Sequence, residues 1–381
     1  MTRFASALSQ HPIAANAVGE AAGEILERLD GEGCDLAVCF ASTHHVGAFE
    51  DIGPALRNIL EPRVLVGGTA VAVAGGPHEI EENPALTVFA ARLDAATLTP
   101  VTLRVQETPD GAALTGWPSL DRSPGSLLLF ADPFTFPVDA FLQRVNRDLP
   151  GLQIIGGLAS AAGSPGGNRL VLDERVVDEG AVGVFVDGGG IEVRTLVSQG
   201  CRPIGRPYVV TRGEQNLIEE LGGKPAIERL QELAGAASEE ERELLRRGLH
   251  VGLVVDEHKA EFGRGDFLVR NLLGADESSG ALAVGEQVSV GQTVQFHVRD
   301  AGAADEDLRE MLNGVDAEAA LLFTCNGRGR HLFTVPDHDA GMVENLLGPI
   351  PLAGAFCAGE IGPVGGRNFL HGFTASLALF A

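Results

Sequence analysis

One sequence pattern occurs three times in this chain of 381 residues, and it constrains the fold more than any other feature. Each copy has an apolar strand-like run, a helix-like segment, a second apolar run that reaches a glycine, a glycine-rich hairpin and a closing apolar run. The copies begin at Leu36, Leu127 and Ala320, and their first inner glycines are Gly67, Gly156 and Gly354. We therefore expect a β-α-β-β unit that is used three times.

The connections within each unit predict how its strands run. The first two strands are joined across a helix and should be parallel, whereas hairpins add antiparallel strands. The sequence therefore predicts an α/β fold with α+β mixed sheets, in which repeated β-α-β-β units form two packed mixed-sheet domains with helices on the outside. Gly and Pro accumulate around residue 199, so we expect domains at residues 1–198 and 199–381.

The pattern lapses between the second and third copies. Residues 215–221 and 225–233 have helical character, and Pro225 suits a first helical turn. Residues 238–247 begin with a serine, continue with acids and end with arginines, which is typical of a capped, solvent-exposed helix. Residues 250–300 are rich in strand-like runs.

Composition and charge exclude several classes of partner. The formal net charge of −24 repels nucleic acid and anionic lipid surfaces. The sequence has no uncharged apolar run of membrane-spanning length and no basic leader joined to an apolar core, so we expect a cytoplasmic protein without membrane contact. Its five scattered cysteines fit a reducing compartment and contain no CxxC pair.

The loops after the first strand of each unit are the candidate binding site, because ligands of α/β sheets bind beyond the carboxyl ends of strands. The candidate ligand-binding residues in the first two units are Ser42, Thr43, His44 and Asp132. An alternative role for Ser42 or Thr43 is to cap a helix. The histidines lack HxxxH or HExxH spacing, so we expect no metal.

The glycine pairs at the second strands allow two interpretations. Gly67, Gly68, Gly156 and Gly157 are candidate ligand-contacting residues, because glycine lets a backbone approach a ligand closely. Tight packing between neighbouring elements explains the same glycines without a ligand. No GxGxxG or GxxxxGK[ST] motif is present, so we expect no nucleotide and no other cofactor.

The third unit carries the densest polar loop of the chain. Its candidate ligand-binding residues are Glu360, Arg367, Asn368, His371 and Thr374. Arg367 could fork onto a carboxylate while Glu360 accepts from an ammonium, so we expect these side chains and His371 to surround one cavity for a zwitterion. Alternatively, the polar groups of the hairpin satisfy one another.

Cys325, Asn326 and Arg328 follow the first strand of the third unit and are also candidate ligand contacts. A catalytic Cys325 would need a base and an electropositive setting, which His371 or Arg328 could supply. A small buried cysteine without catalytic function is the alternative.

The third unit also carries a family resemblance. FTCNGRG (323–329), GEIGPVGGRNFLHGFT (359–374) and HVRD (297–300) resemble the C-terminal half of the FIST family, and VGGTAVAVAGG (66–76) in the first unit resembles its N-terminal half. The resemblance implies an intracellular sensory module that binds a small ligand such as an amino acid. Both halves are occupied by the module, so we expect a signalling output protein that acts in trans.

Two functions therefore follow from the sequence. The first is a cytoplasmic sensor that binds a small amino acid-like or anionic metabolite among glycine-rich loops and is not an enzyme. The alternative is a cysteine- and histidine-dependent hydrolase or transferase.

Overall fold

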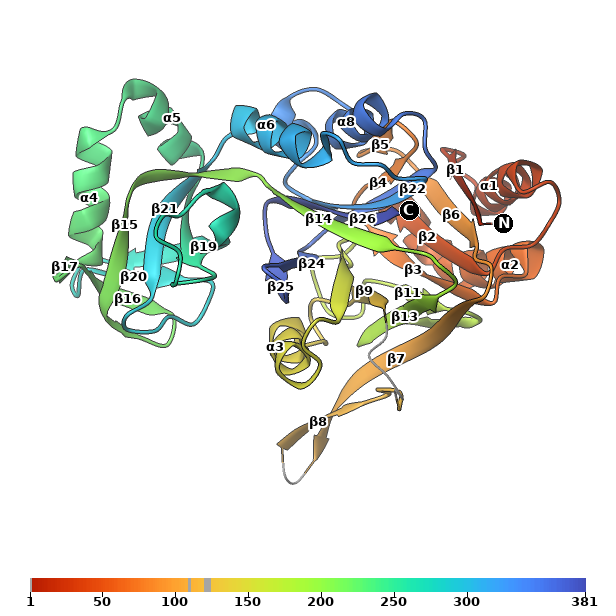
Figure 1. The fold of residues 1–381 in the computed structure, drawn as a ribbon, viewed down its shortest axis with the longest axis horizontal. Coiled ribbons are helices and arrows are strands. Elements are labelled where there is room, and N and C mark those ends of the chain that lie inside the picture. Colours follow the sequence, from red (N-terminus) through yellow and green to blue (C-terminus); the bar gives the residue numbers. More distant parts are fainter. Residues whose placement is uncertain (1, 109–110, 120–124) are drawn as a thin grey trace. The chain divides into compact units, whose positions relative to one another are not determined.

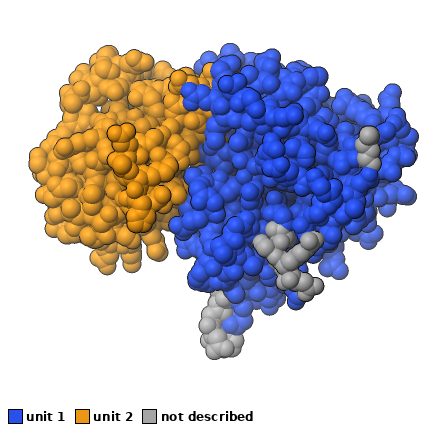
Figure 2. Space-filling view, in the orientation of Figure 1, with its two compact units in different colours: residues 1–197, 308–370, 374–381 blue, residues 198–307, 371–373 orange. Residues whose placement is uncertain are grey.

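The protein divides into two compact units, which Figure 2 colours separately. The structure is a computed structural model and describes residues 2–108, 111–119 and 125–381. Unit 1 comprises residues 1–197, 308–370 and 374–381, and unit 2 comprises residues 198–307 and 371–373. The chain thus leaves unit 1 at residue 197 and returns to it at residue 308. The division into domains at residues 198 and 199 stays a prediction, because these units follow contacts rather than sequence order.

Unit 1 contains three mixed sheets. In spatial order, the strands of the first sheet are β1 (Arg3–Ser9), β6 (Leu86–Arg92), β2 (Leu36–Ser42), β3 (Val64–Ala70), β11 (Leu170–Leu172) and β12 (Arg175–Val177). Those of the second are β25 (Arg367–His371), β24 (Glu360–Val364), β10 (Gln153–Leu158), β9 (Ser126–Ala131), β13 (Ala181–Gly188), β7 (Ala96–Thr108) and β8 (Gly111–Thr115). Those of the third are β14 (Val193–Gln199), β26 (Thr374–Phe380), β22 (Ala319–Cys325), β23 (Leu352–Cys357), β4 (Val73–Gly75) and β5 (His78–Ile80).

Each sheet contains one parallel pair joined across a helix. The pairs are β2–β3, β9–β10 and β22–β23. The connecting segments contain η1 (Thr43–Ala48) and α2 (Phe49–Leu60), α3 (Val138–Asp148), and α7 (Arg330–Phe333) and α8 (His338–Leu347). The predicted parallel pairing is confirmed, and so is the mixed α+β fold class. That the three units are copies of one repeat stays a prediction.

The hairpins cross between sheets, which the sequence did not reveal. The hairpin of each unit pairs with the second strand of another unit: β4 with β23, β11 with β3, and β24 with β10. All three pairings are antiparallel. The three exchanges form a closed cycle. Each of the three sheets is therefore completed by the hairpin of a different β-α-β-β unit.

The first strands of the three parallel pairs, β2, β9 and β22, are buried along their whole length because both of their faces are covered. In β2, Leu36, Val38 and Phe40 join a central core that all three sheets share, whereas Ala37 and Cys39 face the opposite way. Helices α1 (Ala14–Arg28) and α2 cover the outer face of the first sheet (Figure 1). Helix α3 covers the second sheet, and α8 with the end of α6 (Ala301–Leu312) covers the third. This double burial explains the continuous apolar runs.

Unit 2 is built around an antiparallel sheet. Its order is β15 (Cys201–Glu214), β21 (Thr293–Arg299), β18 (Leu249–Val254), β19 (Phe267–Asp276), β20 (Ala281–Val284), β16 (Leu217–Leu221) and β17 (Lys224–Pro225). β15 also pairs with β16, so the sheet closes on itself. Two helices, α4 (Ala226–Ala236) and α5 (Glu239–Arg247), and the short turn η2 (Arg264–Asp266) complete it.

The predicted helix over residues 215–221 is wrong. Gln215 has a left-handed backbone, with φ of 54°, and forms a turn between β15 and β16. Residues 217–221 then pair with β15 and β20 as a strand. The helical spacing extended over too few residues to outweigh these tertiary hydrogen bonds. The helix predicted at 225–233 is confirmed as α4, with Pro225 directly before it.

The predicted cap of α5 is confirmed. Ser238 Oγ accepts a hydrogen bond from Glu241 N at 3.1 Å, and Glu241 Oε2 accepts one from Ser238 N at 2.9 Å. Together they form a capping box. We expect Ser238→Ala to lower the free energy of unfolding by about 1 kcal/mol. Denaturant unfolding followed by far-UV circular dichroism would measure this. Ser238→Asp keeps an acceptor and serves as control; equal losses in both variants would contradict the role of the cap.

Among the described residues, no helix combines the length and the apolar character needed to cross a membrane.

Candidate ligand-binding site

The ends of the three parallel pairs meet in the centre of unit 1, around three phenylalanines. Phe40, Phe130 and Phe323 lie with ring centroids 5.1, 5.6 and 6.0 Å apart. The cavity beside Phe40 and Phe130 measures only about 10 Å³, which is room for about one water molecule. The strand ends therefore converge on packed aromatic rings, which leave no room for a metabolite at this point.

The inner glycines have a packing reason at this convergence. A Cβ atom on Gly67 would lie 1.9 Å from the carbonyl oxygen of Cys39 on the neighbouring parallel strand. A Cβ on Gly156 would lie 1.9 Å from the carbonyl oxygen of Leu129. Such distances are far inside van der Waals contact, so only glycine fits.

The second glycine of each pair is also close to neighbours. A Cβ on Gly157 would lie 2.3 Å from Cys357 Sγ, and one on Gly68 would lie 3.0 Å from a Leu170 methyl carbon. Packing therefore accounts for all four glycines, and ligand binding by them stays a prediction.

Two of the predicted polar side chains of the first two units, Ser42 and Asp132, are engaged in hydrogen bonds within the protein. Ser42 Oγ donates to Asn83 O at 3.2 Å and accepts from Ala85 N at 2.9 Å. Thr43 is half-buried in η1 and His44 is exposed. Asp132 is fully buried, with its carboxylate accepting from Thr135 Oγ1 at 2.7 Å and Asn168 Nδ2 at 2.9 Å. Ser42 thus ties the end of β2 to residues 83–85, and Asp132 stabilises the loop that follows β9.

The third unit contains a buried ion pair that the sequence did not reveal. The Arg328 guanidinium donates to both carboxylate oxygens of Asp339, at 2.7 and 2.8 Å, and neither side chain is exposed. Thr324 Oγ1 donates to the same carboxylate at 2.7 Å, and Arg328 also lies over the Phe333 ring. One guanidinium nitrogen of Arg328, Nη1, has no hydrogen-bond partner in the part of the chain that the structure describes.

Glu360 is a further titratable group of this buried cluster. Its Oε2 accepts from Thr374 N at 3.1 Å and from Thr374 Oγ1 at 2.7 Å. Its Oε1 has no hydrogen-bond partner among the described residues. Cys325 and Cys357 are buried neighbours on the parallel pair β22–β23. The structure therefore brings the predicted residues Cys325, Arg328, Glu360 and Thr374 to the same end of the third sheet.

Burial shifts the ionisation of these groups. Desolvation raises the pKa of Glu360 to about 8, although the bonds from Thr374 oppose the shift. Desolvation also acts to raise the pKa of Asp339, but Arg328 and His338 outweigh it and hold that pKa below its usual value. Desolvation and then Glu360 raise the pKa of the Cys357 thiol well above its usual range. At neutral pH, Asp339 is ionised and Glu360 is protonated.

Arg367, another predicted residue of the third unit, does not join this cluster. Arg367 is exposed and lies over the ring of Phe369, 5.5 Å away. It flanks the two-residue turn between β24 and β25, whereas Glu360 begins β24, about 13 Å along the strand from the turn. The expected meeting of Glu360 and Arg367 in one cavity is therefore corrected, because the hairpin places them at opposite ends of its strands.

Asn368, His371 and Asn326 are the remaining predicted residues of the third unit. Asn368 is buried and binds backbone, donating to Leu152 O at 2.7 Å and accepting from Ile154 N at 2.8 Å. His371 is buried and belongs to the short segment that is grouped with unit 2. Asn326 is exposed. Asn368 therefore stabilises the second sheet.

A polar pocket of about 230 Å³ lies at the edge of the buried ion-pair cluster. Its titratable lining combines hairpin β4–β5 and the following loop with the start of α7 and the segment before α8, and consists of His78, Glu79, Glu81, Glu82, Arg330 and Asp337. The sequence did not point to the four residues from the first unit. They reach this pocket because β4 pairs with β23, a partner that no local signal specifies.

Glu79 connects this pocket to the buried cluster. Its Oε1 accepts from Asp339 N at 2.9 Å and Ala340 N at 3.0 Å, at the N-terminus of α8. Its Oε2 is buried without a hydrogen-bond partner among the described residues. Asp337, whose backbone is left-handed with φ of 60°, accepts from Glu79 N at 2.6 Å. Desolvation and then the Asp339 charge raise the pKa of Glu79 to about 8.

A positively charged side chain also lines the same pocket. Arg330 is exposed, and its backbone N–H donates to Glu81 Oε1 at 3.1 Å. Its guanidinium approaches Glu81 only at 3.9 Å, through Nε. A guanidinium and several carboxyl groups therefore face one small space, which is the pattern that recognises both ends of a zwitterion.

A catalytic role of Cys325 stays a prediction, and so does the expected absence of a metal. The described residues contain no group of three or more His, Cys, Asp or Glu side chains suited to hold a metal ion. Cys325 Sγ accepts from Gly327 N at 3.5 Å, and the neighbouring Arg328 is already engaged by Asp339.

Comparisons with known proteins find matches along most of the chain. The model of the FIST N domain matches residues 35–224, and the model of the FIST C domain matches residues 226–363. Protein Mb0898c of Mycobacterium bovis is 48% identical over 97% of this chain and 96% of its own length. Protein Rv0628c of Mycobacterium tuberculosis is 46% identical over 99% of both chains. Both relatives are named as uncharacterized proteins.

Proposed function

Because this chain belongs to the FIST family, whose domains serve sensing and signal transduction, we propose that it senses a small amino acid-like metabolite in the pocket between Glu79 and Arg330. An output protein that acts in trans would read the bound state. The observation that carries the proposal is the Glu79 carboxyl group: buried, held at one oxygen by two amides of α8, and without a partner at the other among the described residues.

The pocket suits a ligand with an ammonium group. Glu79, Glu81 and Asp337 contribute carboxyl groups to its lining, and buried carboxylates bind an ammonium through charge-assisted hydrogen bonds. Arg330 offers a planar fork for a carboxylate. The volume of about 230 Å³ is smaller than that of a pocket for a drug-sized ligand. These features favour an amino acid over a purely anionic metabolite, which the carboxylates would repel.

The buried cluster behind the pocket would transmit binding. An ammonium on Glu79 favours its ionised form, which places a new charge beside Asp339 and Arg328 at the start of α8. A change in the position of α8 would then report the ligand to the partner.

We expect amino acids to raise the melting temperature of the protein, and Glu79→Gln to weaken their binding by about tenfold or more, since the glutamine cannot ionise. Thermal shift would screen the amino acids, and isothermal titration would measure the affinities. Glu310→Gln removes an exposed carboxylate of α6 outside the pocket and should bind normally. Unchanged binding by the Glu79→Gln variant would refute the assignment.

Affinity should also increase with pH. The Glu79 carboxyl group must lose its proton to pair with an ammonium, and its pKa in the free protein is about 8. Below this value each unit of pH should change the affinity by up to about tenfold, and the dependence should disappear in Glu79→Gln. Titrations between pH 6 and pH 8 would test this. A flat profile for the parent protein would contradict a role for Glu79.

A further inference from the structure

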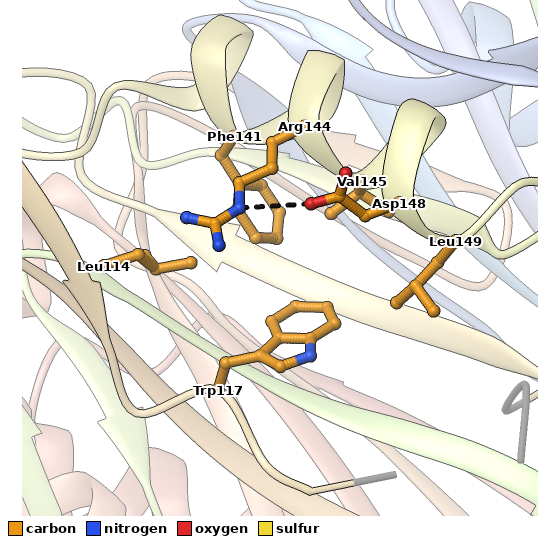
Figure 3. A pocket seen from close by; sticks show the side chains of 7 residues that line it. All are labelled: Leu114, Trp117, Phe141, Arg144, Val145, Asp148 and Leu149. Atoms are coloured by element: carbon orange, nitrogen blue, oxygen red, sulfur yellow. Dashed lines mark hydrogen bonds and ion pairs between the residues drawn. The ribbon is translucent and has the colours of Figure 1, made fainter.

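A second pocket of unit 1 lies beside helix α3 and has a volume of about 260 Å³ (Figure 3). Its walls are mainly apolar: Leu114, Trp117, Phe141, Val145 and Leu149. The helix contributes residues 141, 144, 145 and 148, and its C-cap contributes Leu149; these positions recur at helical spacing and so form one continuous stripe. The opposite wall comes from Leu114 in β8 and from Trp117, which follows this strand.

The tryptophan of this pocket is held in place by its neighbours. The Trp117 ring meets Phe185 edge-on, with centroids 5.5 Å apart and an interplanar angle of 88°. It meets Phe141 at 5.7 Å and 60°. Both contacts have the geometry that aromatic rings favour. Trp117 therefore offers the pocket an aromatic surface whose orientation is already set.

The pocket is lined by one charged side chain of each sign, Arg144 and Asp148, and Asp148 also binds Arg147, which lies outside the lining. Arg144 Nε donates to Asp148 Oδ2 at 3.3 Å, and Arg147 Nε donates to Asp148 Oδ1 at 2.8 Å. Two guanidinium groups thus face one carboxylate. No described residue hydrogen-bonds to the two terminal nitrogens of Arg144, which extend over the pocket in Figure 3. The terminal nitrogens of Arg144, whose side chain is largely exposed, are therefore available to an anionic ligand.

We propose that this pocket binds a small aromatic carboxylate. The ring would lie against Trp117 and Phe141, where apolar and aromatic contacts stabilise it. The carboxylate would accept two hydrogen bonds from the terminal nitrogens of Arg144, the paired geometry that guanidinium groups favour. A short linker between the ring and the carboxylate of the ligand would allow the ring to contact the apolar wall while the carboxylate reaches the charged rim.

This site is independent of the proposed amino acid pocket. The two pockets share no lining residue. Loss of amino acid binding in Glu79→Gln would therefore leave the Trp117 pocket unchanged, and the failure of one proposal would not imply the failure of the other.

Fluorescence of Trp117 provides a direct test, because it is the only tryptophan of the 381 residues. The probes are 3-phenylpropanoate, its neutral analogue 3-phenylpropan-1-ol, and propanoate, which lacks the ring. We expect a saturable change of Trp117 emission with 3-phenylpropanoate, at least about tenfold weaker binding of the alcohol, and no binding of propanoate. Isothermal titration would supply the affinities independently of the optical signal.

Variants separate the contribution of the charge from that of the apolar wall. Arg144→Gln should weaken binding of 3-phenylpropanoate by about tenfold and leave the alcohol unaffected, since only the carboxylate contacts the guanidinium. The side chain of Arg144 is 62% exposed, so this variant should fold normally. Arg246→Gln, on α5, is the matched exposed control and should bind like the parent. Equal affinity for carboxylate and alcohol, unchanged binding in Arg144→Gln, or no saturable signal would overturn the proposal.

Discussion

Arg328→Met is expected to destabilise unit 1 by about 3–5 kcal/mol, the range observed when one partner of a buried ion pair is removed. The substitution would leave the Asp339 carboxylate ionised inside the protein, with neither side chain of the pair exposed. The hydrogen bond from Thr324 Oγ1 and the contact with His338 would remain, but neither supplies the lost positive charge fully. The cost is therefore mainly that of an unpaired buried charge.

Denaturant unfolding followed by Trp117 fluorescence would measure this loss, because Trp117 lies in unit 1 and reports on that unit alone. The double variant Arg328→Met/Asp339→Leu should recover much of the stability, since apolar side chains can replace a buried ion pair. Arg330→Met changes an exposed arginine nearby and should cost less than about 0.5 kcal/mol. A loss below about 1 kcal/mol in Arg328→Met would show that the pair is not a buried ionic interaction.

Glu360→Gln is expected to remove a loss of stability that the parent protein shows as the pH increases from about 5 to about 8. The folded state holds the pKa of Glu360 at about 8, whereas the ordinary value is 4.5. Below pH 4.5 the group is protonated in both states and the burial of its charge costs nothing. As the pH increases from 4.5 to 8, the unfolded chain releases the proton and the folded chain keeps it, so stability is progressively lost.

The size of this loss is on the order of 5 kcal/mol at most, from the value of one pKa unit. Glutamine resembles the protonated acid, so Glu360→Gln should gain stability relative to the parent as the pH increases from about 5 to about 8. Unfolding free energies measured at several pH values in that interval would show it. The matched control is Glu310→Gln, whose pH profile should parallel that of the parent. Parallel profiles for Glu360→Gln and the parent would refute the raised pKa.

These two residues also show how far the candidate site could be predicted. The sequence indicated that Arg328, Glu360, Cys325 and Thr374 follow buried strands of one unit, and the structure places them at one end of the third sheet. It did not indicate Asp339 as the partner of Arg328, because the start of a short helix does not specify which side chain it presents to a neighbour. The pairing depends on how α8 packs against β22.

The sequence alone determined the local elements and the family. Continuous apolar runs predicted β2, β9 and β22, the serine and flanking charges predicted the capped helix α5, and the motifs CNGRG and GEIGP indicated the FIST family. These features depend on residues that are close in the chain, so local propensity is sufficient to specify them.

Only the tertiary structure decided which hairpin completes which sheet. The three second strands, β3, β10 and β23, are similar apolar edges, and each could satisfy the backbone of any of the three hairpins. The choice of β23 for β4 brings Glu79 to α8, about 260 positions later in the chain. Partners of exposed strand edges are selected by the packing of the whole core, and no stretch of sequence carries that information by itself.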